Sequence, residues 1–388
     1  MSVLLDKIQS TFASFATVAW KTLFSLLPRD RRFIVFGAWA GMKYDDNARA
    51  LFEYCLAERP DLTCVWHTRN PEVEAEMRRE GLPVCHIRSF QAFADICRAK
   101  YIVHTDSPLD FGWSAFTGGA RIINLWHGVG PKRFGYDIKK SPTPFGEFLI
   151  HLEQRVGRHF YFSTSAAISD RYVRAFRSKP DHILDRGQAR NDLFYTPHRN
   201  PLRDRFPGKK IIVYMPTFRE DGKNRLPMDL DTLVDLPTLH ALCEKAGMVF
   251  LVKFHPWTDG HVSDRYPDIL ELKDSRIRVQ MLLDAADILV TDYSSCFVDH
   301  LLLDRPQVFF AYDLDHYIAH ERNLYGDFRK DATGRICEDQ SALLDELMRI
   351  SEGEDRYAGK RQEIRDFYYS RENQKAVSAK QVDTILQL

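Results

Sequence analysis

The chain has 388 residues, of which 44% are apolar and 28% are charged, and its formal net charge is zero. This is an ordinary composition for a soluble globular protein, and the length is sufficient for two domains. The lack of an overall positive charge argues against nucleic acid as a partner. Seven scattered cysteines without a CxxC pair indicate reduced, mostly buried thiols in a cytosolic compartment.

The N-terminal segment differs from the rest of the chain. Apolar residues recur at intervals of three or four over Leu4–Leu27, which predicts an amphipathic helix that ends at Pro28. Lys21 interrupts this weakly apolar stretch and the basic run Arg29–Arg32 follows it, so we expect neither a membrane-spanning helix nor a secretory signal. Two interpretations remain open: a helix lying in the membrane interface, or a helix packed on the protein's own surface.

Strands and helices then alternate along the first half of the chain. Predicted strands lie at 32–38, 63–66, 84–87, 101–105 and 121–126, and predicted helices at 45–58, 71–79 and 89–98. Strands separated by helices of this length predict parallel pairing in a doubly wound sheet. The aromatic loop at 107–119 either faces a membrane or packs its own aromatic side chains.

A second alternating series follows the charged segment Asn200–Lys209, which is the best candidate for a linker. Its predicted strands lie at 211–215, 248–254, 276–279, 288–291 and 308–311, with helices at 237–246 and 295–303, and the chain is mostly helical from 341 onward. We therefore predict a membrane-associating helix (1–30), two Rossmann-like domains (31–199 and 200–370) and a C-terminal helix (371–388).

Unusual polar sequences follow several predicted strands. They are Trp126–Lys132, Gly187–Asp192, Pro216–Asp221, His255–Trp257 and Thr291–Ser295. In parallel α/β sheets, ligands bind beyond the carboxyl ends of the strands. Each sequence alone is weak evidence, but together they are difficult to explain as turn chemistry.

These sequences contain groups suited to phosphate chemistry. His127 is a candidate general base, and His255 could donate a hydrogen bond to a phosphate or a leaving group. Ser294 and Ser295 begin a helix and could hold a phosphate there, or could simply cap that helix. The candidate binding residues are Gly128, Lys132, Arg190, Thr217, Arg219, Lys253, Asp292, Ser294 and Ser295. Each cation taken alone is more often a solvated surface charge.

Other signals do not support a cofactor or a metal. Gly128 and Gly130 lack the third glycine of a dinucleotide-binding fingerprint. The DxD-like pairs at Asp229 and Asp313 do not clearly follow strands, and DxD occurs often by chance. We therefore predict no cofactor and no metal.

The polar motifs together resemble the signature of the CDP-glycerol glycerophosphotransferases, the teichoic-acid primases and polymerases of bacteria. Tyr44–Asn47 and Arg322–Phe328 fit the same pattern, so the resemblance covers roughly residues 32 to 370. It implies a GT-B fold, with two Rossmann-like domains facing across a cleft. It also implies peripheral attachment to the cytoplasmic face of the membrane.

The resemblance also implies roles for individual residues. The family's first-domain histidine corresponds to His127, as candidate base, and its second-domain histidine to His255, at the donor phosphates. The family's arginine falls on Arg219 and its paired serines on Ser294 and Ser295. Gly-Gln-Ala-Arg at 187–190 departs from the commoner Gly-Tyr-Pro-Arg.

The function that follows from the resemblance is transfer of glycerol phosphate from CDP-glycerol to a hydroxyl of a polyprenyl-diphosphate-linked saccharide, with release of CMP. A ribitol-phosphate transferase or a nucleotide-sugar glycosyltransferase on the same fold is the alternative. A non-catalytic membrane scaffold is a reading from a different class, and a scaffold would need neither histidine. The expected partners are thus CDP-glycerol, the lipid-linked acceptor and a membrane surface.

Overall fold

A computed structural model describes residues 16–388 apart from 139–147, 149–150, 153, 155, 157, 222–223, 256–257, 275–276 and 321–323. The chain forms two compact units. Unit 1 contains residues 1–127, 135–192 and 369–388, and unit 2 contains residues 128–134 and 193–368. The unit boundaries do not coincide with those of the predicted domains: residues 128–134 and 193–199 group with unit 2, and the N-terminal segment and the C-terminal helix group with unit 1.

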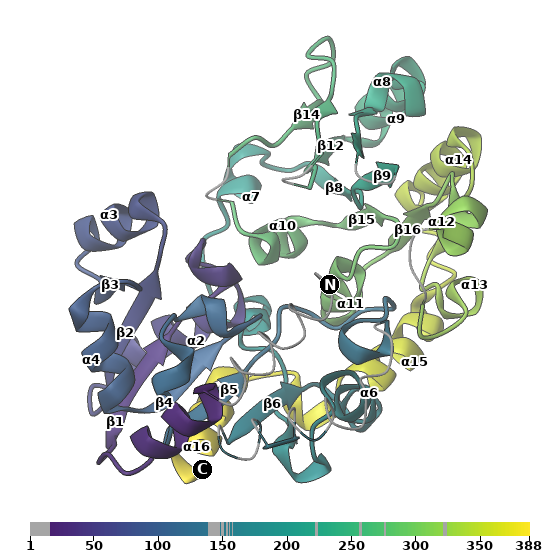
Figure 1. The fold of residues 1–388 in the computed structure, drawn as a ribbon. Coiled ribbons are helices and arrows are strands. Elements are labelled where there is room, and N and C mark those ends of the chain that lie inside the picture. The colour runs from purple at the N-terminus through teal and green to yellow at the C-terminus, as the bar shows by residue number, and fades with distance from the viewer. Residues whose placement is uncertain are drawn as a thin grey trace. The chain divides into compact units, whose positions relative to one another are not determined.

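Within the described residues, unit 1 is built on a parallel seven-stranded sheet with the order β3-β2-β1-β4-β5-β6-β7 (Figure 1). Its strands are β1 (Asp30–Phe36), β2 (Thr63–Thr68), β3 (Val84–His86), β4 (Ala99–His104), β5 (Arg121–Asn124), β6 (His159–Ser163) and β7 (Ile183–Asp185). Its described α-helices include α2 (Asp46–Glu58), α3 (Pro71–Arg79), α4 (Phe90–Arg98), α6 (Ala166–Phe176) and α16 (Val377–Gln387).

Both faces of this sheet are buried, which explains the continuous apolar character of its strands. On one face, Ile34 and Phe36 of β1 join a core that includes Leu51 of α2. On the other face, Phe33 and Val35 pack with residues that include Ile96 of α4. The alternation of side chains along β1 therefore produces the doubly wound arrangement that the pattern predicted.

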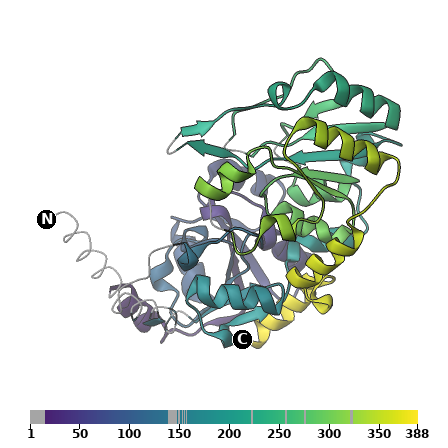
Figure 2. The same cartoon turned by 90° about the vertical axis from the view of Figure 1, so that its right-hand side faces the viewer.

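The end of the chain completes the core of unit 1. Val377, Val382 and Ile385 of α16 are each about 1% exposed and belong to the same core as α2. Figure 2 shows this yellow helix beside elements from the first part of the chain. The C-terminal helix is thus an integral part of unit 1.

Unit 2 has, among its described residues, a parallel six-stranded sheet with the order β14-β12-β8-β15-β16-β17. The strands are β8 (Lys210–Met215), β12 (Met248–Val252), β14 (Ile269–Glu271), β15 (Ile288–Thr291), β16 (Gln307–Phe310) and β17 (Arg335–Cys337). Short ribbons pair β9 (Arg219–Asp221) with β10 (Asn224–Leu226), and β11 (Met228–Asp229) with β13 (Gly260–His261).

Helices lie on both faces of this second sheet. The described helices of unit 2 include α7 (Pro201–Arg205), α8 (Leu230–Leu233), α9 (Leu236–Ala246), α10 (Val279–Ala285), α11 (Cys296–His300), α12 (Leu314–His320), α13 (Phe328–Asp331), α14 (Gln340–Ser351) and α15 (Ala358–Tyr368). Ile212 of β8 packs in the core with Leu239 of α9, whereas Ile211 packs in the opposite core with Leu282 of α10. The predicted doubly wound α/β architecture is thus present in each unit.

One element prediction in unit 2 was wrong and another needs a refinement. The strand predicted at 276–279 is absent from its described part, because Val279 begins α10 and the edge of the sheet is formed by β14 instead. The helix predicted to end at Leu303 does end there, but it is α-helical over Cys296–His300 and its last turn is a 3-10 helix, η7 (Leu301–Leu303). Hydrophobic spacing alone does not distinguish these alternatives.

The N-terminal helix prediction falls partly outside the described residues. Residues 16–24 are helical, and they pack on unit 1 through aromatic contacts. The ring of Phe24 lies 4.8 Å from that of Phe116 and 6.3 Å from that of Phe93. The Trp20 ring also contacts Phe116, with centroids 5.6 Å apart. Trp20, Leu23 and Leu26 nevertheless remain 46%, 55% and 81% exposed. The helix therefore packs on the protein and also presents apolar side chains to its surroundings.

Two further expectations concern the aromatic loop and the thiols. Phe111 is fully buried and Phe116 packs on Phe24, so these aromatics of the 107–119 loop pack inward. All seven cysteines are free, and all but Cys97 are buried, as predicted. No helix in the described residues is long and apolar enough to cross a membrane.

Candidate active site

His127 follows the carboxyl end of β5 and is half-buried in unit 1. Its ring is tilted against those of Trp126 and Trp39, with centroid distances of 4.2 and 5.9 Å. Nδ1 lies 3.3 Å from the carbonyl oxygen of Thr105. Since a carbonyl can only accept, Nδ1 carries the proton in the neutral ring and Nε2 has a lone pair available. This is the tautomer that a general base requires.

The backbone at His127 is held by polar residues from two other segments. Asn47, which is fully buried at the start of α2, donates to the carbonyl of Trp126 at 2.9 Å. Arg190 donates to the carbonyl of His127 at 2.9 Å and forms an ion pair with Asp46 at 2.8 Å. The left-handed backbone at Trp126, with φ of 55°, is therefore fixed by direct hydrogen bonds. Arg190, predicted to bind substrate, has these positioning contacts in the structure, and its contact with substrate stays a prediction.

The buried carboxylate of Asp110 holds in place Thr105, whose carbonyl faces His127. Asp110 accepts hydrogen bonds from the backbone NH groups of Thr105, Asp106 and Ala40 at 3.0, 2.8 and 2.6 Å. Burial opposes its ionisation, but the neighbouring His104, whose Nδ1 lies 3.5 Å from the carboxylate, and these backbone NH groups outweigh that effect and lower the pKa of Asp110. Asp110 therefore joins the loops after β1 and β4 and holds Thr105 where it orients His127.

The glycine segment after His127 belongs to unit 2. A Cβ atom at Gly130 would lie 2.8 Å from the Cβ of Ser295, so only glycine allows this approach. Gly128 has φ of 141°, which other residues rarely adopt. Lys132 pairs through its backbone with Leu324, and its ammonium lies 5.5 Å from the centre of the Tyr317 ring. Gly128 and Lys132 are thus placed in the same unit as the predicted serine pair.

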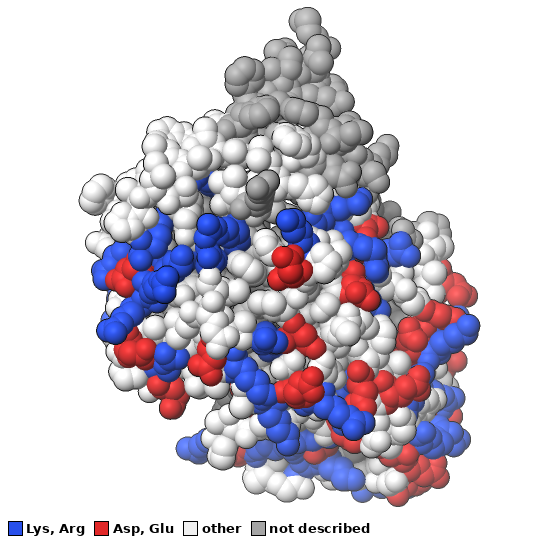
Figure 3. Space-filling view, turned by 90° about the horizontal axis from the view of Figure 1, so that it is seen from below, with Lys and Arg blue, Asp and Glu red and all other residues white. Residues whose placement is uncertain are grey.

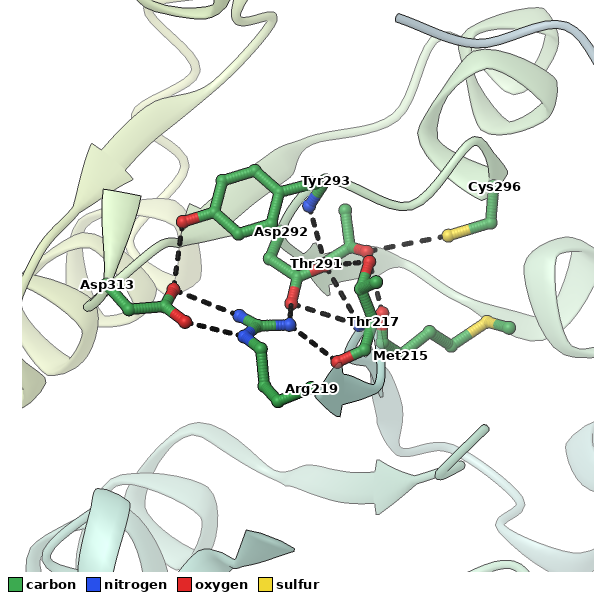
Figure 4. Close-up of polar contacts among 8 residues, drawn as sticks. All are labelled: Met215, Thr217, Arg219, Thr291, Asp292, Tyr293, Cys296 and Asp313. Carbon is green, nitrogen blue, oxygen red and sulfur yellow. Dashed lines mark hydrogen bonds and ion pairs between the residues drawn. The ribbon is translucent and has the colours of Figure 1, made fainter. Parts of the chain in front are cut away.

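Three of the predicted residues of unit 2 form one buried network (Figure 4). The carboxylate of Asp292 accepts from the backbone NH of Thr217 at 2.9 Å and from its hydroxyl at 2.6 Å. Arg219 forms ion pairs with Asp292 at 2.9 Å and with Asp313 at 2.5 Å. The hydroxyl of Tyr293 donates to Asp313 at 2.9 Å. The network therefore joins the turn after β8 to the turn after β15 and to the segment after β16.

The charges of this network determine the protonation state of Arg219. Its side chain is 7% exposed, and although burial disfavours the cation, the charges of Asp292 and Asp313 outweigh that effect and raise its pKa. Burial and the charge of Asp313 likewise raise the pKa of Tyr293, which stays a neutral donor. The guanidinium is thus a permanent structural cation with two carboxylate partners, and its proposed contact with phosphate stays a prediction.

The remaining predicted residues of unit 2 lie near the same edge of its sheet. Lys253 follows β12 and donates to the carbonyls of Leu272 and Asp274, each at 3.0 Å. The ring of His255 lies 4.8 Å from that of Phe218, while the rest of its motif, 256–257, lies outside the described residues. Ser294 accepts a long contact of 3.5 Å from the NH of Cys296, and Ser295 makes no side-chain cap.

Sequence reasoning missed most of the positioning residues. Asp46 and Asn47 lie in a motif that contributed to the family resemblance, but they received no role there. Asp313 was considered only as part of a DxD pattern, whereas the structure makes it the partner of Arg219. Asp110 has no local sequence signal, because its hydrogen-bond partners come from separate loops.

Two groups of side chains in the described residues have geometry that could hold a metal ion. One consists of the buried His67, Cys85 and Asp95, and the other of Asp229, Asp231 and His261. Neither group contains a predicted site residue. In the first group, both nitrogens of His67 already face oxygen acceptors, the carbonyl of Phe111 and the carboxylate of Asp95.

Two doubly wound parallel sheets, each with predicted site residues beyond the carboxyl ends of its strands, are typical of the GT-B fold class. The wall teichoic acid polymerase TagF has a similar fold: the solved structure of one variant aligns with a TM-score of 0.76 and 22% identity, over 99% of this chain and 97% of that one.

The chain belongs to the CDP-glycerol:poly(glycerophosphate) glycerophosphotransferase family, which matches residues 19–387. It is therefore a transferase of the CDP-glycerol glycerophosphotransferase class, as the motifs predicted. The chain is 29% identical to a teichoic acid glycerol-phosphate transferase of Staphylococcus aureus (strain NCTC 8325 / PS 47), over 94% of this chain and 95% of that protein.

Similarity to longer enzymes covers only part of their length. The chain is 26% identical to a teichoic acid poly(glycerol phosphate) polymerase of Bacillus subtilis (strain 168), over 89% of this chain but 48% of that protein. It thus spans about half the length of this polymerase. Enzymes named for ribitol phosphate are similar as well.

Proposed function

We propose that this enzyme transfers glycerol phosphate from CDP-glycerol to a hydroxyl of a polyprenyl-diphosphate-linked saccharide. The acceptor oxygen attacks the β-phosphorus in line and forms a new P–O bond. The bond from that phosphorus to the bridging oxygen breaks, and CMP leaves with the α-phosphate. The acceptor proton passes to Nε2 of His127.

The orientation of His127 is the observation that carries this proposal. Thr105 accepts from Nδ1, which keeps Nε2 unprotonated in the neutral ring, and Asn47 and Arg190 hold the backbone around the imidazole. A positioned base of this kind lowers the barrier for attack by a weakly acidic hydroxyl. A scaffold protein would need neither the tautomer nor the hydrogen bonds that maintain it.

The donor phosphates are assigned to unit 2. His255 and the hydroxyls of Ser294 and Ser295 would donate hydrogen bonds to the phosphate oxygens, with the charge of Lys253 close by. Arg219 has two carboxylate partners, so its main contribution would be to hold the turns at Thr217 and Asp292 in shape. Thr217 and Asp292 would then support the site through the backbone.

Membrane contact is part of the same proposal, with the enzyme peripheral on the cytoplasmic face. The exposed side chains of Trp20, Leu23 and Leu26 support it, because an apolar surface beside basic residues suits an interfacial position. A lipid-linked acceptor would then meet an enzyme already confined to the bilayer surface.

A donor panel tests the proposal. The protein is incubated with CDP-glycerol, CDP-ribitol or a nucleotide sugar and a soluble glycosyl-diphosphate acceptor, with CMP or nucleoside diphosphate release and the new phosphodiester measured. CDP-glycerol should turn over fastest. Faster turnover of CDP-ribitol would reassign the polyol, turnover of only a nucleotide sugar would reject phosphate transfer, and failure to bind any donor would support the scaffold.

A further inference from the structure

The amino ends of four adjacent strands in unit 1 each carry basic side chains. Arg29 and Arg31 lie at the start of β1, Lys100 at the start of β4, Arg121 at the start of β5 and Arg158 just before β6. The sheet order places β1, β4, β5 and β6 side by side in parallel. Neighbouring strands are about 4.8 Å apart, so these side chains form a row along the amino ends of the strands. His127 lies at the other side of the sheet, beyond the carboxyl ends of the strands.

A cavity of about 600 Å³ opens at this row. It is lined by Thr22, Ser25, Leu27, Arg29, Arg31, Lys100, Gly119, Leu152, Val156 and Arg158. Seen from below, Lys and Arg side chains form a band across the surface beside a region with few charges (Figure 3). The cavity thus has four cationic side chains and, among its described lining residues, no carboxylate.

The positive charges of this cavity are not neutralised within the described residues. Arg31, Lys100 and Arg158 make no side-chain hydrogen bond or ion pair there, and Asp30 is instead paired with Arg98. Arg29 donates to backbone carbonyls, including that of Ala99. Arg121 donates through Nε to the carbonyl oxygen of Leu388 at 2.7 Å, and another of its nitrogens is buried without a partner among the described residues. Burial, followed by the charges of Arg121, Arg158, Arg31 and Arg29, lowers the pKa of Lys100. A bound anion would relieve this repulsion.

We propose that this cavity at the amino edge of the unit 1 sheet binds a phosphate-bearing ligand, with Arg31, Lys100 and Arg158 as its free cations. Guanidinium groups match two phosphate oxygens at once, and lysine adds a point charge. Such a ligand would hold together β1, β4 and β6, whose ends are otherwise mutually repelling. The cavity is distinct from the surroundings of His127, because it lies at the amino ends of the strands of unit 1 and His127 lies at their carboxyl ends.

The phosphate group could belong to an anionic lipid or to a soluble phosphate compound. Leu27 lines the cavity, and the exposed Trp20, Leu23 and Leu26 belong to the same N-terminal segment, which favours a lipid head group. Only the choice of a lipid as the source of the phosphate rests on the membrane contact that we propose above. The cavity and its charges do not depend on that contact.

Two probes distinguish the sources. Inorganic diphosphate is titrated calorimetrically with CDP-glycerol in excess, and vesicles of phosphatidylglycerol or phosphatidylcholine are used for cosedimentation. The test variant is Lys100→Gln with Arg158→Gln, which leaves the basic run Arg29–Arg32 intact. The matched control, Arg79→Gln with Arg88→Gln, removes two exposed charges from the same unit outside the cavity.

We expect the cavity variant to bind diphosphate or phosphatidylglycerol roughly tenfold or more weakly, since each lost charge removes a charge-assisted hydrogen bond, and the control to bind like the unaltered protein. Binding of diphosphate would show that a soluble phosphate compound is sufficient to occupy the cavity. Binding of phosphatidylglycerol without binding of diphosphate would show that the ligand is a lipid head group. Equal weakening in both variants, equal binding to phosphatidylcholine, or no saturable binding of either probe overturns the proposal. Turnover of CDP-glycerol on a soluble acceptor, measured in parallel, reports separately on the proposed function.

Discussion

At the scale of single residues, the two histidines have different expected roles. His127→Ala should lower turnover by ~10²–10⁴-fold, the usual contribution of a positioned base, while affinity for CDP-glycerol stays unchanged. His255→Ala should lower both, because we place it on the donor phosphates. Steady-state kinetics and calorimetry with CDP-glycerol measure the two effects.

His261→Ala is the matched control for these variants, because His261 is exposed and lies outside the proposed site. It should retain both turnover and affinity. Loss of CDP-glycerol binding in His127→Ala, with normal binding in His255→Ala, would show that the two roles are assigned the wrong way round.

A second residue-scale prediction concerns the pH dependence of stability. His67 is fully buried. Burial opposes its protonation, but the contact with Asp95, the neighbouring Cys85 and the hydrogen bond to the Phe111 carbonyl outweigh this and raise its pKa to about 9. The unfolded pKa is about 6.5, so the stabilisation is fully present below that pH and is lost as the pH rises toward 9. The free energy of unfolding should fall by about 3 kcal/mol over this range.

Denaturant unfolding between pH 6 and pH 9 measures this change. Asp95→Asn keeps the shape of the partner but removes its charge, so its stability should depend less on pH over this range. An identical pH dependence in the unaltered protein and in Asp95→Asn would mean that His67 is neutral in the folded state.

At the scale of elements, the N-terminal helix packs on the protein and also exposes apolar side chains, so it has features of both alternatives that the sequence left open. Deleting it would expose Phe93 and Phe116, so point variants are the better test. Leu23→Ser with Leu26→Ser removes only exposed apolar surface and should weaken cosedimentation with phosphatidylglycerol vesicles roughly tenfold or more.

The matched control for the helix is Leu226→Ser with Ile318→Ser, two apolar residues of unit 2 that are 43% and 45% exposed. We expect the control to sediment normally. If both variants sediment like the unaltered protein, the exposed face of the helix does not contact the bilayer.

At the scale of the whole molecule, the chain returns to unit 1 at its end. Val382→Ala with Ile385→Ala should destabilise unit 1 by about 4 kcal/mol or more, because both side chains are fully buried in its core. Hydrogen exchange should increase in α2 and β1 and remain unchanged in β8 and β15. Gln387→Ala, at an exposed position of the same helix, is the control, and faster exchange confined to unit 2 would contradict this domain assignment.

The structure of the whole molecule also shows why some predictions from the sequence succeeded and others failed. Alternating apolar segments correctly predicted two parallel sheets, because burial on both faces produces continuous apolar strands. The predicted strand at 276–279 failed because its local pattern suits either a strand or the start of a helix. The C-terminal helix was recognised as a helix, but its core was not predictable, since its partners in α2 lie far away in the sequence.

The sequence by itself determined the fold class, the family and the positions of His127, His255 and the serine pair after strands, because these depend on patterns among chain neighbours. Only the tertiary structure decided which charges meet. Arg219 and Asp313 are 94 residues apart, and their ion pair forms because β8, which precedes Arg219, and β16, which precedes Asp313, both lie next to β15 in one sheet. In the same way, the order of β1, β4, β5 and β6 gathers basic side chains from distant segments into one cavity, since long-range packing sets strand order.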